Sequence, residues 1–84
     1  MADYDYAVVG GGMVGAAIAY GLTRRVAQRG RRVVLLDEGD RALRAARGNF
    51  GLVWVQSKGL NCPPYAHWTR DSADLWPDFE RELR

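Results

Sequence analysis

Three glycines and one aspartate stand at spacings that could carry chemistry. Gly10, Gly12 and Gly15 form a Gly-x-Gly-x-x-Gly pattern, and Asp37 follows 22 residues after the last of them. A glycine turn allows the backbone to approach a diphosphate closely, because no Cβ atom intervenes. A carboxylate at the end of the next strand can accept hydrogen bonds from ribose hydroxyls, which favours a free 2′-hydroxyl over a 2′-phosphate. The pattern therefore predicts a dinucleotide site.

The elements around the glycines are those that such a site requires. Residues Tyr4–Val9 are rich in strand-forming types and predict a strand, while apolar residues recur at every fourth position from 14 to 26 and predict a helix over 13–29. The backbone N–H groups of Met13 and Val14, at the helix start, would face the phosphates. The apolar run at 33–36 predicts a second strand, buried on both faces as in a parallel sheet.

These elements predict the fold class. Strand, helix and strand follow one another before Asp37, so we expect an α/β chain with a Rossmann-like βαβ unit and parallel strands. A glycine-rich turn that binds no ligand is the plain alternative. We expect residues 1–57 to form the cofactor-binding segment, and residues 58–84 to form a linker and an amphipathic helix.

The second half of the chain carries weaker signals. We expect a short helix at 41–46, a loop at Arg47–Gly51, and a strand or extended segment at Leu52–Val55. A further loop is expected to run to Pro64, followed by a helix with apolar residues at spacings of three and four. Pro77 interrupts that pattern, either by kinking the helix or by standing in the first turn of a second one.

Composition and charge exclude several classes of protein. With 84 residues the chain suffices for one small domain, and its 48% hydrophobic content and net charge of +2 argue against disorder. One Cys and one His can form neither a disulfide nor a four-ligand zinc site, so we expect no metal. The arginines at 24–32 are better explained by a solvated helix end than by a nucleic-acid surface.

The apolar run at 8–22 could be mistaken for a targeting segment. It follows Asp3 and Asp5 and no basic residue, which is unlike a secretory signal, and it is too short and glycine-rich to span a membrane. We therefore expect a cytoplasmic protein without a transmembrane segment.

Three stretches of the chain resemble a known family: YDYAVVGGGMVGAAIAYGL, RRVVLLDEGD and RAARGNFGLVWVQSKG. They are similar to the N-terminal portion of FAD-dependent amino-acid oxidases and dehydrogenases of the D-amino-acid oxidase and glycine oxidase type. The tail HWTRDSADLWPDFEREL resembles the helix that follows in opine and hydroxyproline dehydrogenase-like subunits. The resemblance covers essentially the whole chain, but only the beginning of a family member.

The resemblance implies FAD as the cofactor and assigns residues to it. The glycine turn and Asp37 would hold the ADP half, Glu38 would lie beside the adenine, and the Arg47–Gly51 loop would run toward the flavin. The implied cofactor-binding residues are Gly10, Gly12, Met13, Val14, Gly15, Asp37, Glu38, Arg47, Gly48, Asn49 and Gly51. Ala46 departs from the family pattern, in which serine is common at this position.

The resemblance also implies a reaction. Hydride would pass from the carbon of a C–N bond to the flavin, and water would hydrolyse the resulting imine; the substrate would be a D-amino acid, glycine or an opine-like secondary amine. The residues that bind the substrate carboxylate come from later in a family member, so we assign no catalytic residue.

The sequence separation of Gly15 and Asp37 is about one helical turn longer than usual in flavoproteins. This separation predicts a helix that is longer by one turn at its C-terminal end, within residues 23–30.

Two other functions fit parts of the sequence. The first is a nicotinamide-binding module, although the Asn49–Gly51 loop and the segment at 52–56 favour flavin. The second is a non-catalytic, truncated fragment whose apolar surfaces serve only for association, because two strands and one helix leave a sheet face bare. For a flavin-linked activity we expect the missing remainder or a partner subunit to be needed.

Overall fold

The computed structural model describes residues 3–39 and 44–84. The chain divides into two compact units, Met1–Asn49 and Phe50–Arg84. The boundary between the units lies a few residues before the functional division expected at residue 57, which stays a prediction.

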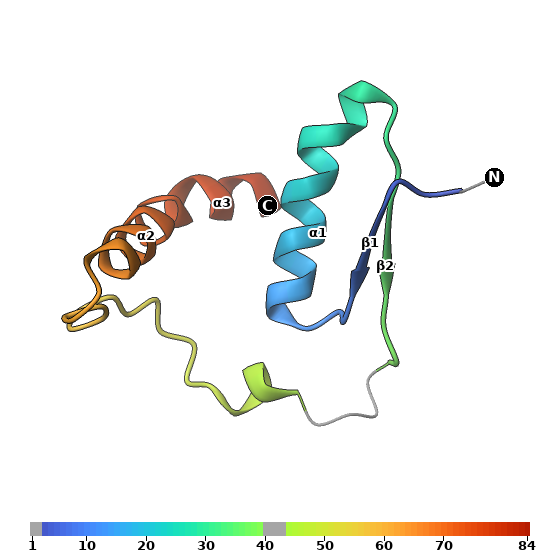
Figure 1. Cartoon of the computed structure of the whole chain (residues 1–84). Helices are drawn as coiled ribbons and strands as arrows, with labels where there is room; N and C mark the ends of the chain where they lie inside the picture. The colour runs from blue at the N-terminus through green and yellow to red at the C-terminus, as the bar shows by residue number, and fades with distance from the viewer. Residues whose placement is uncertain (1–2, 40–43) are drawn as a thin grey trace. The chain divides into compact units, whose positions relative to one another are not determined.

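The first unit is built around a strand–helix–strand motif. Strand β1 (Tyr6–Val9) leads into helix α1 (Met13–Val26), a 3₁₀ turn η1 (Ala27–Arg29) follows, and strand β2 (Val33–Leu36) returns beside β1. The strands are parallel, with Tyr6 opposite Val33 and Val9 opposite Leu36. Figure 1 shows α1 running alongside this sheet. The predicted α/β class with parallel strands is confirmed.

Glycines bound the helical segment that α1 and η1 form together. Gly12 precedes the first turn in an extended conformation, and Gly30 caps the end with a φ of 67°. The chain is helical without a loop from Met13 onward, although its last predicted turn is 3₁₀ rather than α. That this helix is longer than is usual in flavoproteins stays a prediction.

The predicted first strand began two residues too early. The Asp5 carboxylate accepts a hydrogen bond from the backbone N–H of Arg32 (2.9 Å) and another from the Arg31 guanidinium (3.0 Å). The Asp5 side chain therefore binds the Arg32 N–H, which would donate to a backbone carbonyl oxygen if the strand were longer. The regular ladder starts at Tyr6.

Few side chains are buried. Val26 is the one hydrophobic residue that is buried among those the structure describes. Leu35 and Leu36 are 42% and 52% exposed, so the prediction that β2 is buried on both faces is wrong for this chain. The physical reason is that the described part of the first unit has one α-helix, which covers one face of the two-stranded sheet and leaves the other face exposed.

The remaining elements correct several boundaries. Residues 41–43 of the expected helix at 41–46 lie outside the described residues; a 3₁₀ turn η2 (Ala45–Gly48) follows, so Arg47 and Gly48 are in a turn and not in a loop. In the second unit, Leu52–Val55 forms no strand. Helices α2 (Pro63–Asp74) and α3 (Trp76–Leu83) complete that unit.

Prolines mark the starts of both C-terminal helices. Pro63 and Pro64 lie in the first turn of α2, so the expected loop ends before them and not at Pro64. Pro77 lies in the first turn of α3, which selects a second helix over a kinked one. Proline is tolerated there because the first N–H groups of a helix have no intrahelical partner.

Helix α1 approaches the glycine turn so closely that one position excludes any side chain. A Cβ atom on Gly15 would lie 1.7 Å from the carbonyl oxygen of Gly10. A Cβ atom on Gly21, in the same helix, would meet nothing within 4 Å. The absence of a side chain at Gly15 is thus what allows the helix to start directly after the turn.

This difference predicts opposite effects of the same substitution in one helix. Gly15→Ala forces the helix away from the turn and should destabilise the chain by about 2–4 kcal/mol. Gly21→Ala should stabilise it by about 0.5–1 kcal/mol through helix propensity. Thermal unfolding followed by far-UV circular dichroism measures both, and equal midpoints for the two variants would contradict the close approach.

Candidate functional site

The glycine turn lies at the carboxyl end of the two strands. Gly10 has a φ of 102°, in the left-handed region that glycine enters freely, and its N–H donates to the carbonyl oxygen of Leu36 at 2.7 Å. Helix α1 then starts without a side-chain cap and without an acidic residue in its first turn. The first N–H groups of a helix have no intrahelical acceptor, and the positive end of the helix dipole favours an anion there.

Asp37 is held beside this turn by three donors. Its Oδ1 accepts a hydrogen bond from the backbone N–H of Gly11 at 2.9 Å. Its Oδ2 accepts from the backbone N–H of Gly39 at 3.1 Å and from the guanidinium of Arg44. The Arg44 guanidinium and, after it, the Gly11 N–H hold the pKa of the Asp37 carboxyl well below its usual range. The group is therefore an ionised acceptor at neutral pH.

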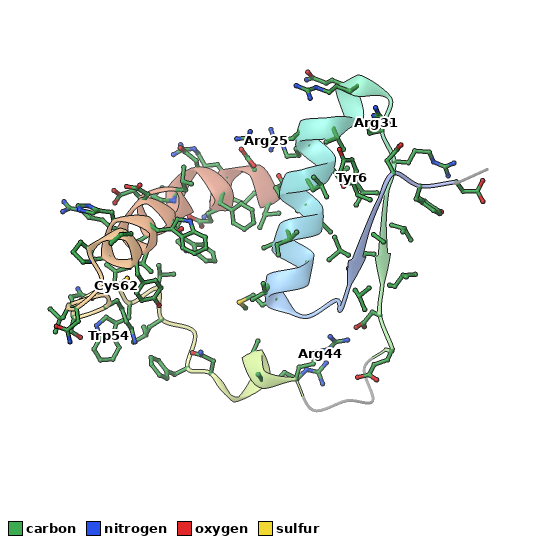
Figure 2. The ribbon with its side chains drawn as sticks, viewed as in Figure 1. Tyr6, Arg25, Arg31, Arg44, Trp54 and Cys62 are labelled. Atoms are coloured by element: carbon green, nitrogen blue, oxygen red, sulfur yellow. The ribbon has the colours of Figure 1, made fainter. Side chains whose placement is uncertain are left out.

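Arg44 connects the acid to the glycine turn. Besides Asp37, it donates to the carbonyl oxygen of Gly39 at 3.2 Å. Its Nη1 lies 3.8 Å from the position that a Cβ atom on Gly12 would occupy. Figure 2 shows the Arg44 side chain projecting from the segment before η2 towards the carboxyl end of the sheet. Arg44 is not among the site residues predicted from the sequence.

Two neighbouring hollows surround these residues. The larger, of about 410 Å³, contains most of the turn and the start of α1. The smaller, of about 340 Å³, contains the acidic end of β2. The larger is lined by Val8, Val9, Gly10, Gly12, Met13, Val14, Gly15, Ile18, Arg44, Ala45 and Ala46. The smaller is lined by Val9, Gly10, Leu36, Asp37 and Glu38.

The structure thus brings together seven of the predicted cofactor-binding residues and leaves four aside. The seven are Gly10, Gly12, Met13, Val14, Gly15, Asp37 and Glu38. Of the others, Arg47 and Gly48 close η2, Asn49 follows it, and Gly51 belongs to the second unit. None of these four lines either hollow. Their role toward a flavin stays a prediction.

Gly11 is a second site residue that was not predicted from the sequence. A Cβ atom there would lie 3.1 Å from both Cβ and Cγ of Asp37, so a larger residue would press against the acid. The signal was present, because Gly11 makes the turn a run of three glycines. Arg44 had no comparable signal, since no fixed spacing relates it to the acid.

The second unit has an apolar groove of its own, of about 370 Å³. Trp54, Trp68 and Trp76 contribute to it, together with residues of the segment at 52–55 and of α2. The hydroxyls of Thr69 and Ser72 donate to backbone carbonyl oxygens at 3.1 and 3.0 Å. The groove therefore offers mainly aromatic surface.

The described residues form neither a metal cluster nor a membrane span. Among residues 3–39 and 44–84, no three or more His, Cys, Asp or Glu side chains gather as they would around a metal ion. No helix in this part of the chain is long and apolar enough to cross a membrane.

Comparison with known proteins gives one family and three relatives. The family model described as FAD dependent oxidoreductase (DAO) matches residues 5–84. The chain is 51% identical over 83 residues to an opine oxidase subunit of Rhizobium meliloti, and 48% identical over 83 residues to the same subunit of Agrobacterium tumefaciens (strain Ach5). It is 35% identical over 81 residues to glycine oxidase of Geobacillus kaustophilus (strain HTA426).

These alignments cover nearly all of this chain and little of each relative. They include 99%, 99% and 96% of the chain, but 21%, 21% and 20% of the three relatives, respectively. The chain thus spans about a fifth of the length of the curated relatives that it matches. No solved structure matches the chain significantly.

The two bound carboxylates predict an acid-sensitive fold. The Arg32 N–H and the Arg31 guanidinium lower the pKa of Asp5, as Arg44 and Gly11 lower that of Asp37. Because both folded values lie below the unfolded value of about 3.9, their stabilisation is complete above that value. It is lost as the pH falls through the lower folded values.

Thermal midpoints between pH 7 and pH 2 test this dependence. The parent chain should lose stability progressively below about pH 4. Asp5→Asn and Asp37→Asn should each lower the thermal midpoint at pH 7. Each should also reduce the fall of the midpoint between pH 7 and pH 2. The two effects should be additive, because the two carboxylates lie at opposite ends of the strands. An unchanged pH profile in both variants would contradict the ionised pairs.

Proposed function

We infer that this chain, which belongs to the FAD-dependent oxidoreductase family whose model spans residues 5–84, binds the ADP half of FAD at its glycine turn. The observation that carries the proposal is the placement of Asp37. Its ionised carboxylate is fixed to the Gly11 N–H at 2.9 Å, at the carboxyl end of two parallel strands. Ligands of open α/β sheets bind at that end of the strands.

The turn fits a diphosphate. Gly10, Gly12 and Gly15 expose bare backbone along a hollow of about 410 Å³, which gives phosphate oxygens close access. The N–H groups of Met13 and Val14 belong to the first turn of α1 and would donate to those oxygens. No acidic side chain in that turn repels the anion.

The second hollow fits the adenosine. Asp37 would accept hydrogen bonds from the ribose hydroxyls, and Glu38, in the same hollow, would lie beside the adenine. The residues Arg47, Gly48, Asn49 and Gly51 would continue along the cofactor toward the flavin. In this proposal, residues 1–57 form the cofactor-binding segment and residues 58–84 form a linker and helices that lead toward a substrate-binding part.

The proposed reaction belongs to the whole enzyme. FAD, when bound, supplies the acceptor for a hydride removed from the carbon of a C–N bond. The relatives named opine oxidase and glycine oxidase support an amino acid or an opine-like secondary amine as the substrate. This chain contributes binding and orientation of the cofactor, and we assign no catalytic residue to it.

A second kind of subunit and a compartment complete the proposal. Two relatives are named as subunits of an opine oxidase, which supports assembly of this protein with a different chain. We also propose the cytoplasm as its location.

Competition between nucleotides tests the proposed site. The 84-residue chain is titrated with FAD, and binding is followed by flavin fluorescence. ADP should displace FAD, because the glycine turn, Asp37 and Glu38 are proposed to bind the ADP half, and FMN should not. Gly12→Val should weaken FAD binding at least about tenfold, since branched carbons would fill the diphosphate cradle.

The control for this variant is Gly21→Ala in the same helix, which should bind FAD as the parent does. A chain that binds NAD⁺ in preference to FAD would favour the nicotinamide alternative. A folded chain that binds neither would contradict the proposal and favour a non-catalytic role.

A further inference from the structure

We propose that Arg44 is the positioning residue for the ribose acceptor Asp37, and that its pairing with this acid determines whether the site takes a free 2′-hydroxyl or a 2′-phosphate. The proposal rests on the proposed function and assigns to that site a residue and a selectivity. Three observations carry it: the contacts of the pair, its exposure and its distance from the glycine turn.

Arg44 binds the Asp37 carboxylate at the oxygen that the glycine turn does not bind. The Gly11 N–H binds Oδ1 of Asp37, while Arg44 binds Oδ2 together with the Gly39 N–H. Arg44 is itself held by the carbonyl oxygen of Gly39 at 3.2 Å. Both oxygens of the acid are thus oriented, and each retains lone pairs for a ribose hydroxyl.

The exposure of the pair distinguishes it from an ordinary surface contact. The side chains of Arg44 and Asp37 are 18% and 27% exposed. The pair between Arg31 and Asp5, at the other end of the same strands, is 57% and 34% exposed. The more enclosed pair is less screened by solvent, so a change in its charges should be felt more strongly by a neighbouring ligand.

The position of Arg44 places it between the two parts of the proposed site. Its Nη1 lies 3.8 Å from the Cβ position of Gly12, and it lines the hollow that contains Met13 and Val14. Asp37 lines the neighbouring hollow. The proposed ribose site therefore lies beside both the carboxylate and the guanidinium.

The selectivity follows from the charges of the pair. In dinucleotide-binding folds, an acid at this position accepts the free 2′-hydroxyl, whereas a nearby arginine accommodates a 2′-phosphate. Here the arginine is bound to the acid, so a 2′-phosphate meets a carboxylate whose negative charge repels it. Removing that charge would leave the guanidinium beside the 2′-position, where it would attract a phosphate.

The test compares two ligands that differ only at the 2′-position, 5′-AMP and adenosine 2′,5′-bisphosphate. Their dissociation constants are measured by NMR titration on the 84-residue chain and on Asp37→Asn, Arg44→Gln and the double variant. The parent should prefer 5′-AMP. Asp37→Asn should shift the ratio at least about tenfold toward the bisphosphate, and adding Arg44→Gln should abolish that shift.

The positioning role has a separate measurement. Arg44→Gln should weaken FAD binding about tenfold, because one charge-assisted hydrogen bond to the acceptor is lost. Arg44→Lys retains the charge and should bind within about threefold of the parent. If Asp37→Asn unfolds the chain, as judged by circular dichroism, this pair of variants still decides whether Arg44 supports the ribose acceptor.

The matched controls are Asp5→Asn and Arg31→Gln, which change the same charges at the opposite end of the strands. They should leave the ratio of the two dissociation constants as it is in the parent. A parent chain that binds FAD, together with an unchanged ratio in Asp37→Asn, would overturn the selectivity and leave the proposed function standing. A parent chain that binds no adenine nucleotide would overturn the proposed function, and this inference with it.

Discussion

The carboxylate of Asp37 is the interaction on which the geometry of the site depends. It joins the glycine turn through Gly11, the residues after β2 through Gly39, and the segment before η2 through Arg44. One backbone hydrogen bond, from Gly10 to Leu36, connects the turn to the end of β2 in addition. Charge-assisted hydrogen bonds are stronger than neutral ones, so a single ionised carboxylate can fix the relative positions of three segments of the chain.

This reliance on polar contacts follows from how little of the chain is buried. A two-stranded sheet is marginally stable in water unless it packs against other elements. Val9 at the end of β1 is 82% exposed, and Val26 is the buried hydrophobic residue of the part that the structure describes. The strands are instead held by carboxylates at both ends, Asp5 at the start and Asp37 at the finish. Carboxylate hydrogen bonds therefore connect the strands at both ends of their backbone ladder.

The sequence predicted local structure well and tertiary contacts poorly. The strand at Val33–Leu36, the helix start at Met13 and the family resemblance are confirmed, because apolar periodicity and the glycine turn are local signals. The burial of β2 was wrong, because burial depends on what covers a strand and not on its own residues. Arg44 was missed for a similar reason: its partner Asp37 is seven residues away in the chain, and no local pattern links them.

Arg44 also relates the two halves of the proposed cofactor path. It is the residue that precedes η2, and its carbonyl oxygen accepts a hydrogen bond from the N–H of Arg47 at 3.0 Å. Its side chain is meanwhile bound to the carboxylate that we assign to the ribose. The segment proposed to run toward the flavin therefore begins at a residue anchored to the adenosine end. The Arg44 side chain orients the proposed ribose acceptor, and the Arg44 backbone starts the next segment. The position of the side chain therefore constrains the direction in which that segment leaves the site.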